Sequence, residues 1–257
     1  MGSLSIAVAE EQSSRLRAYR RLAGLLLLFA ICVPPHLVAR LFGRSPWPRN
    51  FLKWVAWGSG MDFRIAGSPA SSGTLLLSNH VSWLDIPILA AATGCAFVAK
   101  AEVQDHWFLK WLADQNETIY IDRSSMRTIH GQVDALSRGL ERPQPLTLFP
   151  EGTVGDGSRL LPFKPTLLSA VAPPPEGIVI RPVAIDYGRI APIIGWGTGE
   201  PGLKNFFRVL GLEGRHVVTV HLLDALPPDR DRKLLARHAH DAIAGALMPS
   251  GMAPARV

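Results

Sequence analysis

Six short, nearly continuous apolar runs constrain the fold of this chain more than any other feature of its sequence. Strands of this kind are expected to be covered on both faces, as in a parallel sheet with helices on each side. The predicted strands are Thr74–Ser78, Ala96–Ala99, Thr118–Ile121, Leu146–Phe149, Ile178–Ile185 and Val217–Leu222. Helical patterns lie between them, over 83–93, 102–114, 125–142, 164–171 and 230–247. The alternation predicts an α/β fold with a mixed, mostly parallel sheet flanked by helices.

The composition excludes several classes of protein. Hydrophobic residues make up 47% and charged residues 19%, the opposite of a disordered chain. Two cysteines, Cys32 and Cys95, are too few for a disulfide framework or a four-thiolate zinc site, which indicates an intracellular protein. The net charge of +6 favours anionic partners, but no run of Lys and Arg interleaves with aromatics, so no nucleic acid is expected.

The first 60 residues are expected to form a basic, membrane-associated helical segment ahead of an α/β domain over 61–250. Arg15, Arg17, Arg20 and Arg21 precede an apolar run that reaches Pro34 and Pro35. A helix that ends at Val33 would span about 18 Å, which is short of the roughly 30 Å hydrocarbon core. A re-entrant or interfacial anchor is therefore favoured over a bent span that continues past the prolines. A cleaved signal peptide is least favoured, because no small-residue cleavage site follows.

Four aromatic residues follow this run, and their spacing also suggests a membrane boundary. They are Trp47, Phe51, Trp54 and Trp57, of which the last three share a helical face. Amphipathic indoles favour the membrane–water interface, although the same face could pack on the α/β domain as core. With the basic flank, this predicts a protein bound to the cytoplasmic face of the inner membrane.

The first candidate for chemistry is the segment from Asn79 to Asp85, which directly follows a predicted strand. Ligand sites of α/β sheets lie at this end of the strands. His80 is a natural general base at neutral pH, and Asp85 would orient its ring. Their five-residue spacing is not one face of a helix, so the two side chains can meet only through a turn between strand and helix.

Further polar groups are expected at the same edge of the sheet. Glu151, Gly152 and Thr153 follow another strand, and amides around Gly152 could face an anion. Lys100 and Arg123 each end a strand and could meet a phosphate or a developing oxyanion. A late glycine-rich segment over 195–202 is expected to be a flexible loop.

Other catalytic patterns are missing from the sequence. It contains no G-x-S-x-G elbow, no Walker-type phosphate loop and no H-E-x-x-H metal spacing. Neither cysteine has the surroundings of an activated thiolate. No metal and no cofactor are therefore expected, and a base without a protein nucleophile indicates that the nucleophile is a hydroxyl of the substrate.

The motifs N-H-x-x-x-x-D at 79–85 and F-P-E-G-T at 149–153 together resemble the glycerolipid acyltransferase family, whose bacterial members acylate lysophosphatidic acid. Weaker matches are Tyr120–Arg123, Ile180–Ala184 and the K-x-E pattern that begins at Lys100. The resemblance covers Met61 to Asp186. It implies direct transfer of an acyl group from acyl-CoA or acyl carrier protein to a lysolipid hydroxyl.

The resemblance also implies roles for these residues. His80 would take the hydroxyl proton, with Asp85 orienting it, while Lys100 and amides near Gly152 would steady the oxyanion. Glu151, Gly152, Thr153 and Arg123 would bind the acceptor.

One departure from the family pattern concerns the acceptor. Many relatives that form phosphatidic acid carry arginine after E-G-T, where this chain has Val154, followed by Asp156. The stretch 156–164 and the late Gly195-Trp196 resemble relatives that acylate lyso-ornithine lipid. Synthesis of phosphatidic acid is ranked first and acylation of lyso-ornithine lipid second. A non-catalytic binder of lipid or carrier protein, and a hydrolase of acyl esters, stay open as alternatives.

Overall fold

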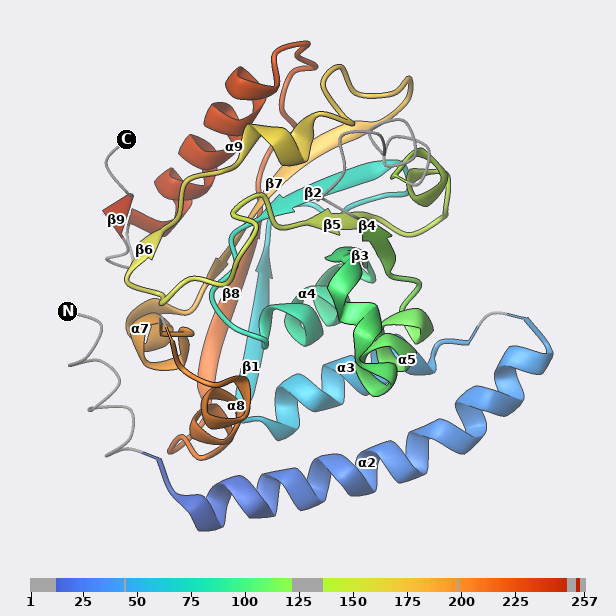
Figure 1. Cartoon of the computed structure of the whole chain (residues 1–257), viewed down its shortest axis with the longest axis vertical. Helices are drawn as coiled ribbons and strands as arrows, with labels where there is room; N and C mark the ends of the chain where they lie inside the picture. Colours follow the sequence, from blue (N-terminus) through green and yellow to red (C-terminus); the bar gives the residue numbers. More distant parts are fainter. Residues whose placement is uncertain (1–12, 44, 122–135, 198, 249–252, 255–257) are drawn as a thin grey trace.

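The computed structural model describes residues 13–43, 45–121, 136–197, 199–248 and 253–254. A seven-stranded sheet with the order β1-β8-β7-β2-β5-β3-β4 lies at its centre (Figure 1). Its strands are β1 (Met61–Ala66), β2 (Thr74–Ser78), β3 (Ala96–Lys100), β4 (Ile119–Ile121), β5 (Leu146–Leu148), β7 (Val179–Asp186) and β8 (His216–Leu222). A small parallel pair joins β6 (Arg159–Leu160) to β9 (Ala253–Pro254).

The predicted fold class is confirmed. All neighbouring strands of the large sheet run parallel except β7 and β8, which are antiparallel. All six predicted strands are present, with ends that differ by at most one residue. Strand β1 was not predicted, because it lies at the sheet edge and its middle residues are exposed or half-buried. By contrast, every residue of β2 is buried, as its continuous apolar run requires.

Helices cover both faces of the sheet. α9 (Arg232–Leu247) packs against β7 on one side, and α3 (Trp47–Gly58) and α4 (Asp85–Thr93) lie together on the other (Figure 1). Shorter helices of the α/β domain include η1 (Ala101–Asp105), α5 (Trp107–Gln115), η3 (Pro165–Leu168), η4 (Gly188–Ile190), α7 (Ala191–Ile194) and α8 (Gly202–Leu210). The helix predicted over 164–171 is thus only a short 3₁₀ turn. Most of the one predicted over 125–142 lies outside the described residues, and 136–140 are helical.

The N-terminal helix corrects one prediction. α2 runs without a break from Arg15 to Leu41, through Pro34 and Pro35. At 1.5 Å per residue its 27 residues extend about 40 Å, so by length and composition it could cross a membrane. The prolines remove two helical hydrogen bonds, but the helix is held by packing on both sides of them.

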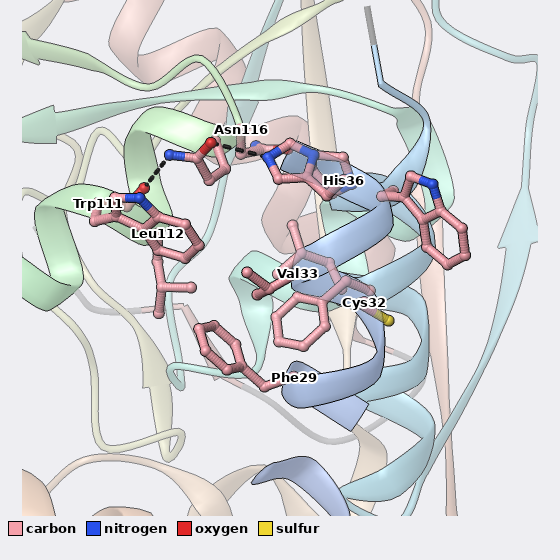
Figure 2. Close-up of a pocket in the computed structure, with 12 residues that line it drawn as sticks. Phe29, Cys32, Val33, His36, Trp111, Leu112 and Asn116 are labelled. Atoms are coloured by element: carbon pink, nitrogen blue, oxygen red, sulfur yellow. Dashed lines mark hydrogen bonds between the residues drawn. The ribbon is translucent and has the colours of Figure 1, made fainter. Parts of the chain in front are cut away.

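That packing runs along much of α2. Phe29 lies about 6 Å, centroid to centroid, from the rings of Phe51, Phe108 and Trp111. His36 contacts Gln115 of α5 at 2.9 Å. Figure 2 shows Phe29, Val33 and His36 of α2 on the side of that helix that faces Trp111 and Leu112 of α5. These side chains line a small, largely apolar cavity of about 50 Å³. The helix therefore lies against the α/β domain, beneath α3 and α8 in Figure 1.

The basic flank of α2 is divided between two environments. Arg17 donates to the carbonyl of Gly211, and Arg21 to the carbonyls of Leu210, Leu212 and Gly214. Both arginines thus satisfy the turn that follows α8. Arg15 and Arg20 are exposed and available to a charged surface.

Candidate active site

The candidate residues meet at one edge of the sheet because the strands that carry them are parallel. β2 leads into His80, β5 into Glu151 and β7 into Tyr187, while β3 ends at Lys100. Carboxyl ends of parallel strands share one edge, where α/β proteins place ligands. Residues that are far apart in the sequence are brought together there.

His80 and Asp85 are in direct contact. The Nδ1 atom of His80 lies 2.7 Å from Oδ2 of Asp85, and the imidazole is 16% exposed while the carboxylate is fully buried. The turn between β2 and α4 closes the five-residue gap, since Val81 and Ser82 also donate their N–H groups to Oδ2 of Asp85, at 2.7 and 2.9 Å. Asp85 therefore fixes both the turn and the ring.

Two residues that the sequence analysis left without a role complete this arrangement. The Tyr187 hydroxyl donates to Oδ1 of Asp85 at 2.5 Å, and burial together with that carboxylate raises the pKa of Tyr187 well above its ordinary value. The Asn79 side chain exchanges two hydrogen bonds with the backbone of Ile185, at 2.8 and 3.1 Å. Asn79 ties β2 to β7, and both residues sit at strand ends, which was the signal available in the sequence.

Glu151 is buried beside the dyad, with 2% of its surface exposed. Its Oε1 accepts the backbone N–H of His80 at 2.7 Å, and its carboxylate also accepts the N–H of Leu161. Burial is the main cause that raises the pKa of Glu151 to about 8, and the nearby Asp85 charge adds to it. Glu151 thus joins the F-P-E-G-T loop to the backbone of the candidate base.

The rest of this loop lies close to His80. The Phe149 ring stacks on the imidazole at 4.1 Å, and the N–H of Gly155 donates to the His80 carbonyl at 2.7 Å. Gly152 has φ +70°, and a Cβ there would come within 3.1 Å of the Lys164 ammonium nitrogen. Glycine therefore allows both the turn and the approach of a cation. Thr153 is exposed.

The structure describes one of the two predicted cations. Lys100 ends β3 at this edge, is exposed, and makes no side-chain hydrogen bond or ion pair with the described residues. Arg123 lies outside the described residues.

The geometry is that of a base without a protein nucleophile. With Nδ1 directed at Asp85, the other ring nitrogen of His80 is left to accept a proton. In the described part of the chain, no hydroxyl or thiol is bonded to His80, and no three His, Cys, Asp or Glu side chains form a metal cluster. A hydroxyl brought in by a substrate could be activated here.

Comparison with known proteins decides the family. The family model described as Acyltransferase matches residues 63–186. A lyso-ornithine lipid O-acyltransferase from Pseudomonas aeruginosa is 35% identical over 91% of this chain and 95% of its own length. The chain belongs to the acyltransferase family. It is a lysolipid O-acyltransferase, as the sequence motifs predicted.

Further similarities agree with this assignment. The lyso-ornithine lipid O-acyltransferase of Rhizobium meliloti is 33% identical over 84% of this acyltransferase and 81% of its own length. A 1-acyl-sn-glycerol-3-phosphate acyltransferase of Neisseria gonorrhoeae is 35% identical, but over 47% of this chain and 48% of its own. The crystal structure of the acyltransferase PlsC from Thermotoga maritima has the same fold, with a TM-score of 0.61 at 18% identity, over 91% of this chain and 98% of that one.

Proposed function

We propose that this acyltransferase transfers a fatty acyl group from acyl-CoA or acyl carrier protein to the hydroxyl of lyso-ornithine lipid. The observation that carries the proposal is the extent of similarity. Relatives named for lyso-ornithine lipid match along most of the chain, whereas the Neisseria relative named for acylglycerol phosphate matches about half. This reverses the ranking of acceptors made from the motifs alone. The valine at position 154, where many phosphatidic-acid-forming relatives have arginine, also supports the reversal.

His80 is the proposed general base. Asp85 holds Nδ1–H at 2.7 Å and leaves Nε2 to take the proton of the acceptor hydroxyl. The hydroxyl oxygen forms a bond to the thioester carbonyl carbon and gives a tetrahedral intermediate. When the carbon–sulfur bond breaks, the imidazolium returns its proton to the departing thiolate. The products are an ester and a free thiol, and no acyl-enzyme forms.

The charge that develops on the carbonyl oxygen needs donors. Lys100 is exposed at the site edge with no partner among the described residues. In the loop near Gly152, the Gly152 N–H is bonded to the Phe149 carbonyl and the Gly155 N–H to the His80 carbonyl, which leaves the N–H groups of Thr153 and Val154 without an acceptor among the described residues. We assign oxyanion stabilisation to these groups. Glu151, Gly152, Thr153 and Arg123 are assigned to acceptor binding, and Glu151 also holds the backbone N–H of His80.

The proposal includes attachment to the membrane through α2 and α3. Leu26, Leu27, Ile31 and Val38 of α2 are between 56 and 62% exposed, and Trp57 of α3 is 60% exposed. Since α2 is packed along the α/β domain, we propose that it lies in the membrane surface at the cytoplasmic face, with its exposed apolar side in the lipid. The active site then sits beside the layer that holds its acceptor.

An acceptor panel tests the proposed function. Purified wild-type enzyme is given lyso-ornithine lipid, lysophosphatidic acid or lysophosphatidylcholine at equal concentration, with acyl-CoA and then with acyl carrier protein as donor. We expect kcat/KM to be highest for lyso-ornithine lipid. A higher value for lysophosphatidic acid would overturn the proposed acceptor while leaving the family intact.

A further inference from the structure

A cavity of about 480 Å³ opens next to the loop that holds His80. One side is formed by Thr153–Asp156, Arg159 and Leu161, and the other by Trp196, Gly197, Gly199 and Glu200, which lie between α7 and α8. We call this space the loop cavity. Gly155 lines it, and the N–H of Gly155 is bonded to the backbone carbonyl of His80, so one wall of the loop cavity is hydrogen-bonded directly to the residue that carries the candidate base.

The far wall of the loop cavity is fixed. Glu200 is paired with Arg208 at 2.8 Å, and both side chains are only 3% exposed. Arg208 also donates to the carbonyls of Gly195 and Ile193, and the Trp196 indole donates to the Glu200 carbonyl at 2.7 Å. The glycine-rich segment was expected to be flexible, but its described residues are held by these bonds.

The two walls are also locked to one another. A Cβ on Gly157 would lie 2.0 Å from the carbonyl oxygen of Ala191, and one on Gly195 would lie 2.1 Å from that of Asp156. The backbone N–H of Trp196 donates to the Gly155 carbonyl at 3.0 Å. Only glycine allows so close an approach, so the loop cavity has a preformed shape.

One negative and one positive side chain face the loop cavity without an ion-pair partner among the described residues. Glu200 is neutralised by Arg208, which leaves Asp156 and Arg159. Asp156 uses Oδ1 to accept from the backbone N–H and the hydroxyl of Ser158, at 3.0 and 2.6 Å, and has no cation bonded to it within the described residues. Arg159 is exposed and has no side-chain hydrogen bond or ion pair with any of them.

We infer that the loop cavity binds the zwitterionic amino-acid head group of the acceptor, with Asp156 holding its ammonium group and Arg159 its carboxylate. The inference rests on the proposed function. Ornithine that is acylated on its α-amino group keeps one carboxylate and one δ-ammonium, and these match the two free charges of the loop cavity. A phosphate monoester carries negative charge alone, which Asp156 repels.

This assignment places specificity at some distance from the chemistry. The acceptor hydroxyl lies on the fatty acid that is amide-linked to the head group, so it is separated from the two charges by a short chain. A fixed cavity adjoining His80 would hold the head group and present that hydroxyl to the imidazole. Asp156 and Arg159 are therefore binding residues, and replacing either one is expected to raise KM more than it lowers kcat.

The test uses three forms of the acceptor. These are lyso-ornithine lipid, the same lipid acetylated on its δ-nitrogen, and the same lipid with its carboxylate converted to a carboxamide. We expect Asp156→Asn to lower kcat/KM for lyso-ornithine lipid by about 10- to 100-fold. On the acetylated lipid, which has no ammonium group for Asp156 to bind, the variant and wild type should have the same kcat/KM. Arg159→Gln should show the same loss for lyso-ornithine lipid and none for the carboxamide.

Two matched controls lie at the opposite edge of the sheet, before α9. Asp229→Asn removes a carboxylate that likewise accepts a backbone N–H two residues further on, and Arg230→Gln removes an exposed guanidinium. Both variants should have the wild-type kcat/KM for all three acceptors.

The outcomes separate the two proposals. If wild type acylates lyso-ornithine lipid and the two cavity variants behave like their controls, or lose activity equally on all three acceptors, the head-group assignment is wrong and the proposed function stands. If wild type prefers lysophosphatidic acid, the proposed function fails first and the head-group assignment fails with it.

Discussion

Asp85→Asn separates the charge of the buried carboxylate from its geometry. Oδ2 of Asp85 accepts from His80 Nδ1, Val81 N and Ser82 N, and Oδ1 accepts from the Tyr187 hydroxyl. An asparagine keeps the first three bonds only if its carbonyl oxygen takes the Oδ2 position. Its NH₂ group then meets the hydroxyl oxygen of Tyr187, which can accept. The two backbone donors therefore hold the amide in the orientation that preserves the ring and its tautomer.

What the variant loses is the negative charge beside the imidazolium that forms in the reaction. A charge-assisted contact of this kind contributes about 2 to 4 kcal/mol at the effective dielectric of a partly buried site. We therefore expect kcat to fall by roughly 30- to 1000-fold. Asp85 is fully buried and touches no substrate in the proposed mechanism, so KM should change by less than about threefold.

The assay follows release of the donor thiol at saturating donor and varied lyso-ornithine lipid. Asp62→Asn, which breaks an exposed ion pair with Arg215, serves as the control and should match wild type. The unfolding temperature of each variant is measured in parallel. A kcat for folded Asp85→Asn within threefold of wild type would refute the role of this carboxylate in the reaction.

Three other predictions concern stability and the membrane. The pKa of Glu151 is raised from 4.5 to about 8, so the contribution of the protonated side chain to stability is complete below pH 4.5 and is lost progressively as the pH rises to 8. Chemical denaturation should therefore show the free energy of unfolding falling by about 2 to 3 kcal/mol from pH 6 to pH 8, and Glu151→Gln should largely remove this fall. Arg208→Met leaves the buried carboxylate of Glu200 without its ion-pair partner and should lower the free energy of unfolding by about 3 to 5 kcal/mol. Arg215→Met, at an exposed ion pair, should lower it by less than about 1 kcal/mol, and equal losses for the two variants would contradict the stabilising role of the buried pair. Ile31→Glu, on the exposed side of α2, should weaken binding to vesicles containing anionic lipid at least about tenfold, while Leu234→Glu on α9 should not, and sedimentation with the vesicles measures both.

The fold was largely predictable because burial on both faces leaves continuous apolar runs. β2, β3, β5 and β7 were found in this way. β1 was missed because Asp62 and Arg64 interrupt its apolar pattern at an exposed edge. The course of α2 was mispredicted because local preference favours a break at Pro34 and Pro35, whereas packing against α3 and the contacts of Phe29 and His36 with α5 hold the helix together.

The candidate site was predictable only in part. His80, Asp85 and Glu151 were found from their motifs and their places after strands. Tyr187 was not, because its contact with Asp85 joins positions 102 apart and follows from the pairing of β2 with β7. The loop cavity was not predicted either. The glycine-rich sequence of 195–202 indicates a flexible loop, and the ion pair between Arg208 and Glu200, which holds this loop in place, is visible only in the structure.

The most direct test of the central claim is a competition assay. Wild type and His80→Ala are each given an equimolar mixture of lyso-ornithine lipid and lysophosphatidic acid, and the acylated products are quantified by mass spectrometry. We expect wild type to form mainly ornithine lipid, and folded, membrane-bound His80→Ala to form neither product above background. Unimpaired turnover by His80→Ala, or mainly phosphatidic acid from wild type, would contradict the central claim.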